Sequence, residues 1–298
     1  MDGEGVISRA TAAMVPSLKR IWRECFGDEG RYIDFLFDAI ARPGDILAAL
    51  DGGGVPQAML CVRKAELTAP ASEPAVCAYI YGVATLPRFQ GRGLSTLLLE
   101  EAHRRLAAEG VSASVLVPAS ESLHTFYSMR GYEAAFPLRR AAVTPRDLPA
   151  RPLPCVLEAG ELGQLEELRR ASFGDSGLFV RWDREYLDAI GAECRLSGGE
   201  VLRYSCGGER GYAVCYDGGK RMAVKEITAS GRVLDSVLAA LHSRFGREEY
   251  LVYLRADRGE NFSKTTLPFG VIRWYDRGAK ERLTATAAAP AYLAHALD

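Results

Sequence analysis

The sequence predicts an α/β (α+β) protein built from two similar domains. At 298 residues the chain is long enough for two cores of ordinary size. Segments with helical apolar periodicity alternate with short apolar or alternating runs that are typical of strands. Near the middle lies "TPRDLPARPLP" (residues 144–154), whose prolines disfavour helix and sheet interior. We therefore expect one domain over residues 1–144, a linker over 145–154 and a second domain over 155–298.

The two halves resemble each other in sequence. "LKRIWRECFGDEG" (18–30) aligns without gaps on "LEELRRASFGDSG" (165–177), so that F-G-D-x-G recurs in the same place. The apolar register continues beyond this stretch, where Ile33 matches Val180. Convergence is an alternative, because glycine commonly stops a helix and aspartate caps the next one. We favour a duplicated fold.

The expected elements follow the same order in both halves. In the first half we expect helices over 15–26, 31–41, 94–106 and 121–130, and strands over 6–12, 45–51, 57–67, 78–86 and 112–118. In the second half we expect helices that begin at Leu165 and Arg181, a helix over 233–245, and strands over 200–206, 211–217, 222–228, 249–256 and 269–276. An alanine-rich tail follows.

Composition excludes several classes of function. The net charge of −1 gives no basic field for nucleic acid, and no apolar run approaches the length of a membrane span. The N-terminus lacks the pattern of a signal peptide, so we expect a cytoplasmic protein. Seven cysteines without a C-x-x-C pair predict buried reduced thiols rather than a disulfide framework, and no metal site is expected.

A glycine turn opens the helix in "LPRFQGRGLSTLLLEEAHRRL" (86–106). The unpaired N–H groups and the dipole at a helix start attract anions, and Gly91 and Gly93 allow a ligand to approach the backbone closely. Arg88 and Arg92 either contact a phosphate or point to solvent. The turn has neither the G-K-S/T of a Walker loop nor the third glycine or alanine of a dinucleotide-binding turn. An ordinary structural turn is the alternative.

Two motifs together point to a known family. "VATLPRFQGRGLSTLLLEEA" resembles the acyl-CoA-binding signature R/Q-x-x-G-x-G/A of the GNAT superfamily of N-acetyltransferases. "LHTFYSMRGY" resembles the superfamily's second element, F/L-Y-x-x-x-G-F/Y. The order of elements over about residues 5–143 also matches. The resemblance implies two GNAT-like domains, each with a mixed, mostly antiparallel twisted sheet flanked by helices. The chain is also distantly similar to the tandem enhanced-intracellular-survival acetyltransferases.

The resemblance implies roles for particular residues. The backbone of Val83, Ala84 and Thr85 would pair with the pantetheine arm of acetyl-CoA. Ser120 stands where the family usually has an asparagine that contacts CoA. The residues that would wrap the pyrophosphate are Arg88, Phe89, Gln90, Gly91, Arg92, Gly93, Leu94, Ser95 and Thr96.

Tyr127 is the candidate catalytic residue. By the resemblance it would protonate the departing thiolate, and a tyrosine O–H beside the sulfur is chemically able to do so. A core aromatic on a short helix is the alternative. The general base is unassigned: Glu121 and His124 lie one turn before Tyr127, although a solvated helix start explains both. In the tandem relatives the C-terminal carboxylate serves the tyrosine, which would make Asp298 a candidate here.

The second half resembles a GNAT fold that has lost its acyl-CoA site. Its counterpart of the glycine turn, "EITASGRVLDSVLAAL", has the single glycine Gly231, and no tyrosine motif follows the strand "EYLVYLRA". Glu226 could reach the first domain, but we favour pairing with Lys225 or exposure to solvent. We therefore expect one active domain and one degenerate domain.

The sequence predicts an acetyl-CoA-dependent N-acetyltransferase that acts on a primary amine of a small molecule or peptide. A non-catalytic acyl-CoA-binding sensor or scaffold is the rival, because the base is missing and the second half is degenerate. A tandem-GNAT aminoacyl transferase ranks last, since no basic patch for tRNA is visible. Trp22, Tyr32 and Phe35 are candidates for the acceptor pocket, with core packing as the alternative. The oligomeric state cannot be read from the sequence.

Overall fold

The computed structural model describes residues 6–259, 262, 264–285 and 289–295. Within those residues the first half of the chain contains, in order, β1 (Val6–Arg9), α1 (Val15–Phe26), α2 (Gly30–Ala39), β2 (Ile46–Leu50), β3 (Pro56–Thr68), β4 (Ala75–Thr85), α3 (Leu94–Ala108), β5 (Ala113–Leu116), α4 (Glu121–Ser128) and β6 (Glu133–Val143). The second half contains β7 (Cys155–Ala159), α5 (Glu166–Phe173), β8 (Phe179–Arg181), α6 (Arg184–Leu196), β9 (Glu200–Cys206), β10 (Glu209–Gly218), β11 (Arg221–Ile227), α7 (Gly231–Phe245), β12 (Glu249–Arg255), β13 (Lys264–Trp274) and α8 (Arg277–Thr284).

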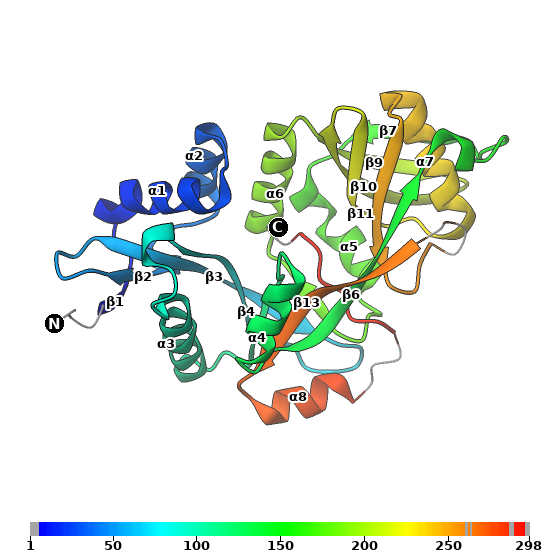
Figure 1. The fold of residues 1–298 in the computed structure, drawn as a ribbon. Coiled ribbons are helices and arrows are strands. Elements are labelled where there is room, and N and C mark those ends of the chain that lie inside the picture. The colour runs from blue at the N-terminus through cyan, green and yellow to red at the C-terminus, as the bar shows by residue number, and fades with distance from the viewer. Residues whose placement is uncertain (1–5, 260–261, 263, 286–288, 296–298) are drawn as a thin grey trace.

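One continuous sheet runs through both halves, with helices on both faces (Figure 1). Its strand order is β1-β2-β3-β4-β5-β13-β6-β12-β11-β10-β9-β7, and β8 pairs with β3 away from this path. Neighbouring strands are antiparallel except for β4–β5 and β11–β12, which are parallel. The predicted fold class, a mixed and mostly antiparallel sheet flanked by helices, is confirmed.

The halves exchange one strand each at the centre of the sheet. β13 from the second half pairs with β5 of the first, and β6 from the first half pairs with β12 of the second. The two exchanged strands also pair with each other, antiparallel. The two predicted sheets are therefore joined into one, and the halves share an extensive hydrogen-bonded boundary.

The helices divide the core into layers. On one face of the sheet, buried side chains of α1, α2 and α6 share a single core that spans both halves, with Trp22, Leu36 and Ile190 among them. On the other face α3 and α4 cover the first half, and α7 covers the second half. Among the described residues no helix is both long and apolar enough to cross a bilayer.

Several predicted boundaries were wrong. The helix expected from Arg181 begins at Arg184, because residues 179–181 form β8 and Asp183 caps the helix by accepting the Tyr186 N–H at 2.7 Å. The matched positions Ile33 and Val180 therefore lie in a helix and in a strand, respectively. β6, β7 and α8 were not predicted.

The prediction of reduced cysteines was wrong for one pair. Cys155 on β7 and Cys206 on β9 are direct cross-strand partners and form a disulfide. Fifty-one residues separate them in sequence, so no local motif marks them. The other cysteines are free thiols: Cys25, Cys61, Cys77, Cys194 and Cys215.

Candidate active site

β4 and β5 diverge in the middle of the first half. They pair only from Cys77–Ala113 to Tyr79–Val115, although β4 continues to Thr85. A register shift between β3 and β4 accompanies Gly82, whose φ is +58°. A Cβ at Gly82 would lie 2.5 Å from the ring of Trp22, so only glycine allows this close packing. The open edge of β4 therefore contains the predicted pantetheine-binding residues Val83, Ala84 and Thr85.

The glycine turn follows that open edge directly. Residues 87–89 form a short 3₁₀ turn, and Gly91 and Gly93 have φ of +76° and +78°. Gly93 is the N-cap of α3, and residues 90–93 are exposed. The first N–H groups of α3 have no partner within the helix, which is the arrangement that binds anions. The turn thus has the backbone geometry that the sequence predicted.

Side chains around the turn hold its shape. The hydroxyls of Thr85 and Ser95 are 2.8 Å apart, and Gln90 Nε2 donates to the Thr85 carbonyl at 3.2 Å. Arg88 and Arg92 are exposed, with their guanidinium carbons 4.9 and 5.3 Å from the Phe89 ring centroid. Both guanidinium groups therefore lie near the Phe89 ring, and that of Arg88 is also 3.7 Å from the Glu24 carboxylate.

Tyr127 lies in α4 with its ring buried. Ser120 caps this helix by accepting the Leu123 N–H at 3.3 Å, so its hydroxyl has a structural role. Burial raises the pKa of Tyr127 to about 12, while the nearby Arg130 acts to lower it. In the described part of the chain, the Tyr127 hydroxyl has no hydrogen-bond partner. The phenol is therefore protonated at neutral pH and available as a donor.

Arg130 is a site residue that the sequence did not single out. Its Nη2 donates to Thr96 Oγ1 at 2.5 Å, and its Nη1 donates to the Phe126 carbonyl at 2.7 Å. Its guanidinium carbon lies 3.5 Å from the Phe126 ring centroid. Among the described residues no carboxylate pairs with Arg130, and its Nε is buried without a partner. Its position inside the tyrosine motif was the available signal.

A buried network of hydrogen bonds surrounds Tyr132, the last residue of the tyrosine motif. The Tyr132 hydroxyl lies 3.0 Å from His103 Nε2 and 2.8 Å from Ser114 Oγ. Tyr275, which follows β13, donates to Ser114 Oγ at 2.7 Å. The second half of the chain therefore helps to fix the tyrosine motif of the first.

The candidate bases lie on another face of α4. Glu121 and His124 line an outer groove of about 920 Å³, together with residues of β6, β12 and β13. Tyr127 does not line that groove. Asp298 lies outside the described residues. Within the described ranges, no three His, Cys, Asp or Glu side chains gather as a metal site would require.

The interpretation of Glu226 as solvated or paired with Lys225 was wrong. Glu226 is fully buried, and its carboxylate pairs with Arg169 at 3.2 Å and His295 Nε2 at 2.8 Å. It also accepts from the hydroxyls of Tyr212 and Tyr292. Burial alone would raise the pKa of Glu226, but Arg169 and His295 hold it below its usual value.

The segment between β11 and α7 contacts the protein itself. Thr228 directly follows β11, and its carbonyl accepts from Arg258 Nη1 at 3.0 Å. α7 then begins at Gly231 after Ser230. This region therefore lacks the exposed double-glycine turn of the first half.

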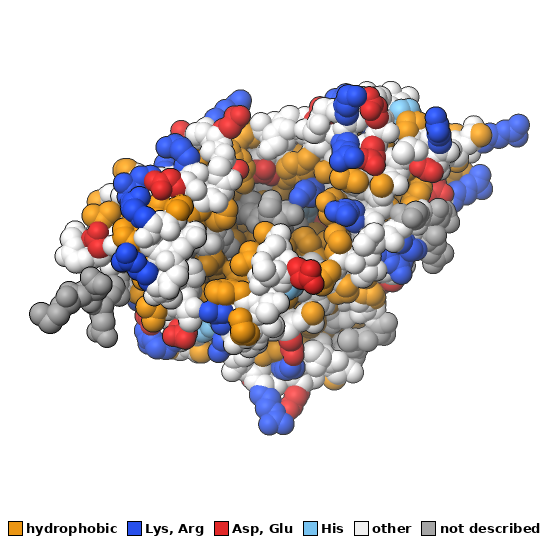
Figure 2. Space-filling model, viewed as in Figure 1, with side chains coloured by type: hydrophobic (Ala, Val, Ile, Leu, Met, Phe, Trp, Pro, Cys, Tyr) orange, Lys and Arg blue, Asp and Glu red, His pale blue; other side chains and the backbone are white. Residues whose placement is uncertain are grey.

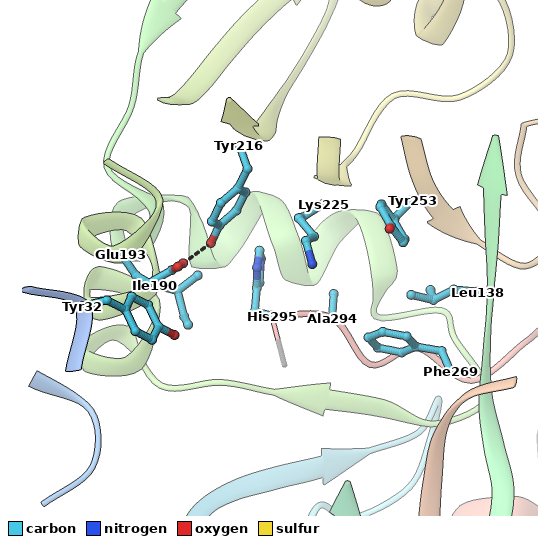
Figure 3. Close-up of a pocket in the computed structure, with 10 residues that line it drawn as sticks. All are labelled: Tyr32, Leu138, Ile190, Glu193, Tyr216, Lys225, Tyr253, Phe269, Ala294 and His295. Atoms are coloured by element: carbon cyan, nitrogen blue, oxygen red, sulfur yellow. Dashed lines mark hydrogen bonds between the residues drawn. The ribbon is translucent and has the colours of Figure 1, made fainter. Parts of the chain in front are cut away.

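A cavity of about 160 Å³ lies where the two halves meet (Figure 3). Of the three aromatic residues predicted for an acceptor pocket, Tyr32 of α2 lines this cavity, whereas Trp22 and Phe35 pack in the core. Phe269 and Tyr253 line both this cavity and the groove along α4. Its remaining walls come from Leu138, Ile190, Glu193, Tyr216, Lys225, Ala294 and His295. Figure 2 shows a hollow between the two halves of the chain.

Solved structures with the same fold cover most of the chain. A probable N-acyltransferase from Enterococcus faecalis is 14% identical, with 91% of this chain and 73% of that one covered at a TM-score of 0.72. A GCN5-related N-acetyltransferase from Kribbella flavida is 18% identical, with 90% and 70% covered at 0.68. Eis1 from Mycobacterium abscessus is 15% identical, with 92% and 75% covered at 0.69. At such low identity these likenesses concern the fold.

One curated protein and one family model match the chain in sequence. A probable porphobilinogen deaminase of Pyrobaculum calidifontis is 31% identical over 99 residues, which cover 32% of this chain and 33% of that protein. The chain therefore spans about a third of the length of that relative. The family model of the acetyltransferase (GNAT) domain matches residues 6–135. Together with the open β4 edge and the glycine turn, this match identifies residues 6–135 as an acetyltransferase (GNAT) domain.

Proposed function

We propose that this protein transfers an acetyl group from acetyl-CoA to a primary amine by direct attack. The observation that carries the proposal is that Tyr127, on α4, is a buried phenol. Along the chain, α4 comes after the open edge of β4 and the glycine turn. Edge N–H and C=O groups of 83–85 would suit pairing with a pantetheine arm, and the amides of the exposed turn 90–93 and of the first turn of α3 would suit the CoA pyrophosphate. Acetyl-CoA supplies the activated thioester.

The residues of the chain would divide the chemistry between them. The N–H of Val83, on β4, would stabilise the oxyanion as the amine nitrogen bonds to the carbonyl carbon. As the carbon–sulfur bond breaks, Tyr127 donates a proton to the thiolate, and the amine loses one proton. A raised pKa keeps Tyr127 protonated across the pH range in which a neutral amine forms. The base that accepts the amine proton is unassigned.

The test is thiol release from acetyl-CoA with a panel of primary amines. We expect wild-type turnover with at least one amine and a loss of about 100-fold or more in kcat for Tyr127→Phe. Tyr204→Phe is the matched control, because it removes another buried hydroxyl, in the second half, 3.0 Å from Thr228 Oγ1. Equal activity of wild type and Tyr127→Phe would refute the general-acid role.

A non-catalytic acyl-CoA sensor is the second candidate. It is favoured by the sequence of the β4 edge, where residues 78–85 contain no acidic side chain that could serve as a base. Binding of acetyl-CoA without thiol release on any amine would support the sensor over the transferase.

A further inference from the structure

One end of the cavity between the halves is anionic. Glu193, on α6, accepts a hydrogen bond from the Tyr216 hydroxyl and one from Ser197 Oγ at 3.3 Å (Figure 3). Burial and the Glu193 charge both raise the pKa of Tyr216, so this phenol stays neutral and donates. Tyr32 lies at the same end. A carboxylate held in this way, away from bulk water, suits an ammonium group.

The middle of the cavity carries positive charge. Lys225 extends from β11 into the space between the two ends, beside the ring of His295 (Figure 3). Its Nζ lies 5.5 Å from the Tyr253 ring centroid. The neighbouring Glu226 is paired within the buried network, so its charge is balanced there by Arg169. Lys225 is thus a cationic side chain on the cavity wall, and a carboxylate bound in the middle of the cavity would lie near its charge.

The other end of the cavity is apolar. Leu138 of β6 and Phe269 of β13 form it, with the ring of Tyr253 beside them (Figure 3). Pro137 and Pro268 fall where the β6–β13 register shifts, between Leu267–Leu138 and Gly270–Phe136. Such an irregularity redirects side chains out of the regular alternation of a strand. The strand exchange thus places an apolar surface next to the two charges.

We propose that this cavity binds a free α-amino acid with an apolar side chain, and that this amino acid is the acetyl acceptor. Its ammonium group would lie at Glu193, its carboxylate at Lys225 and its side chain against Leu138 and Phe269. The volume of about 160 Å³ suits a molecule the size of one amino acid rather than a peptide. The acceptor role rests on the proposed acetyl transfer. In it, the bound ammonium first releases one proton to solvent, and the resulting neutral α-amine nitrogen bonds to the acetyl carbon. The carbon–sulfur bond then breaks, and the second proton lost by the nitrogen balances the proton gained by the thiolate.

The first arm of the test compares acceptors that differ in one group. The acceptors are leucine, leucinamide, isoamylamine and the dipeptide Leu-Gly, each with acetyl-CoA. A charge-assisted hydrogen bond contributes about 1.5–3 kcal/mol, so we expect kcat/KM for leucine to exceed that for leucinamide by about tenfold or more. Isoamylamine and Leu-Gly should fall at or below leucinamide. Equal use of leucine and leucinamide would overturn the proposal, and preference for Leu-Gly would identify peptide N-termini instead.

The second arm changes the protein. Lys225→Met should raise KM for leucine about tenfold or more and leave KM for leucinamide unchanged, and Lys225→Arg should restore most of the affinity. Lys220→Met is the matched control, because Lys220 is exposed in the β10–β11 connection. Glu193→Gln should weaken all the amines while keeping an acceptor for the Tyr216 hydroxyl. A Lys225→Met enzyme with the leucine KM of wild type would overturn the proposal.

Calorimetric titration of leucine without acetyl-CoA separates the cavity from the reaction. We expect wild type and Lys220→Met to bind leucine, and Lys225→Met to bind it at least tenfold more weakly. If this pattern holds but no amine is acetylated, the ligand assignment stands and the proposed transfer falls. If amines are acetylated but leucine binding is indifferent to Lys225, the transfer stands and the ligand assignment falls.

Discussion

Arg130 Nη2 and Thr96 Oγ1 are joined by a hydrogen bond of 2.5 Å, which ties α4 to the first turn of α3. Nη1 of the same guanidinium donates to the Phe126 carbonyl at 2.7 Å. One side chain therefore connects the helix of the candidate acid, Tyr127, to the turn predicted to hold the pyrophosphate. We therefore expect that a ligand bound at the turn would affect the position of the phenol through Arg130.

Replacing Arg130 should impair acetyl transfer in two ways, through its contact with Thr96 and through its effect on Tyr127. Arg130→Met removes the hydrogen bond to Thr96 and the positive charge that lowers the pKa of Tyr127. We expect kcat/KM to fall about tenfold or more, with the alkaline limb of the kcat profile shifted to higher pH, and Arg130→Lys to be intermediate. Arg104→Met, on the exposed face of α3, should match wild type. Wild-type kinetics for Arg130→Met would show that Arg130 has no role in acetyl transfer.

His103 should make the protein sensitive to acid. Burial, and secondarily the charge of Arg273, lower the pKa of His103 to about 3, whereas an unfolded histidine titrates near 6.5. The unfolded state then binds the proton first, so stability should fall as the pH drops from about 6.5 towards 3. His103→Gln should flatten that slope in urea unfolding between pH 7 and pH 4. An unchanged slope would mean that other groups govern acid unfolding.

The Cys155–Cys206 disulfide should stabilise the second half. Closing a loop between residues 51 apart is expected to contribute about 4 kcal/mol in the chain-entropy model. Reductant should therefore lower the Tm of wild type and leave that of Cys206→Ser unchanged. Thiol titration under denaturing conditions should find five thiols without reductant and seven with it. Seven thiols before reduction would show that the bond does not form.

Local features of the sequence predicted the elements around the candidate site. The glycine turn, α3 and the tyrosine motif are each encoded within a few neighbouring residues, and Gly91 and Gly93 have positive φ. The open edge of β4 needs its bulge at Gly82, which the apolar pattern alone did not reveal.

Long-range contacts were not predictable in this way. The exchange of β6 and β13 brings together strands more than 100 residues apart, and each contains a proline that argues against a strand. Arg169 and His295 reach Glu226 from segments 57 and 69 residues away, so Glu226 read as an ordinary surface acid. The central cavity likewise draws its walls from both halves.

The most direct test of the account is calorimetric titration of acetyl-CoA into wild type and Gly91→Asp. Aspartate tolerates the positive φ at this position, and its Cβ would meet open space, so the change adds mainly a negative charge at the turn. Gly54→Asp is the matched control, with φ of +79° and open space in the β2–β3 connection. We predict one acetyl-CoA per chain for wild type and Gly54→Asp, and binding weakened by about tenfold or more for Gly91→Asp. Two molecules per chain, or wild-type affinity in Gly91→Asp, would contradict the account.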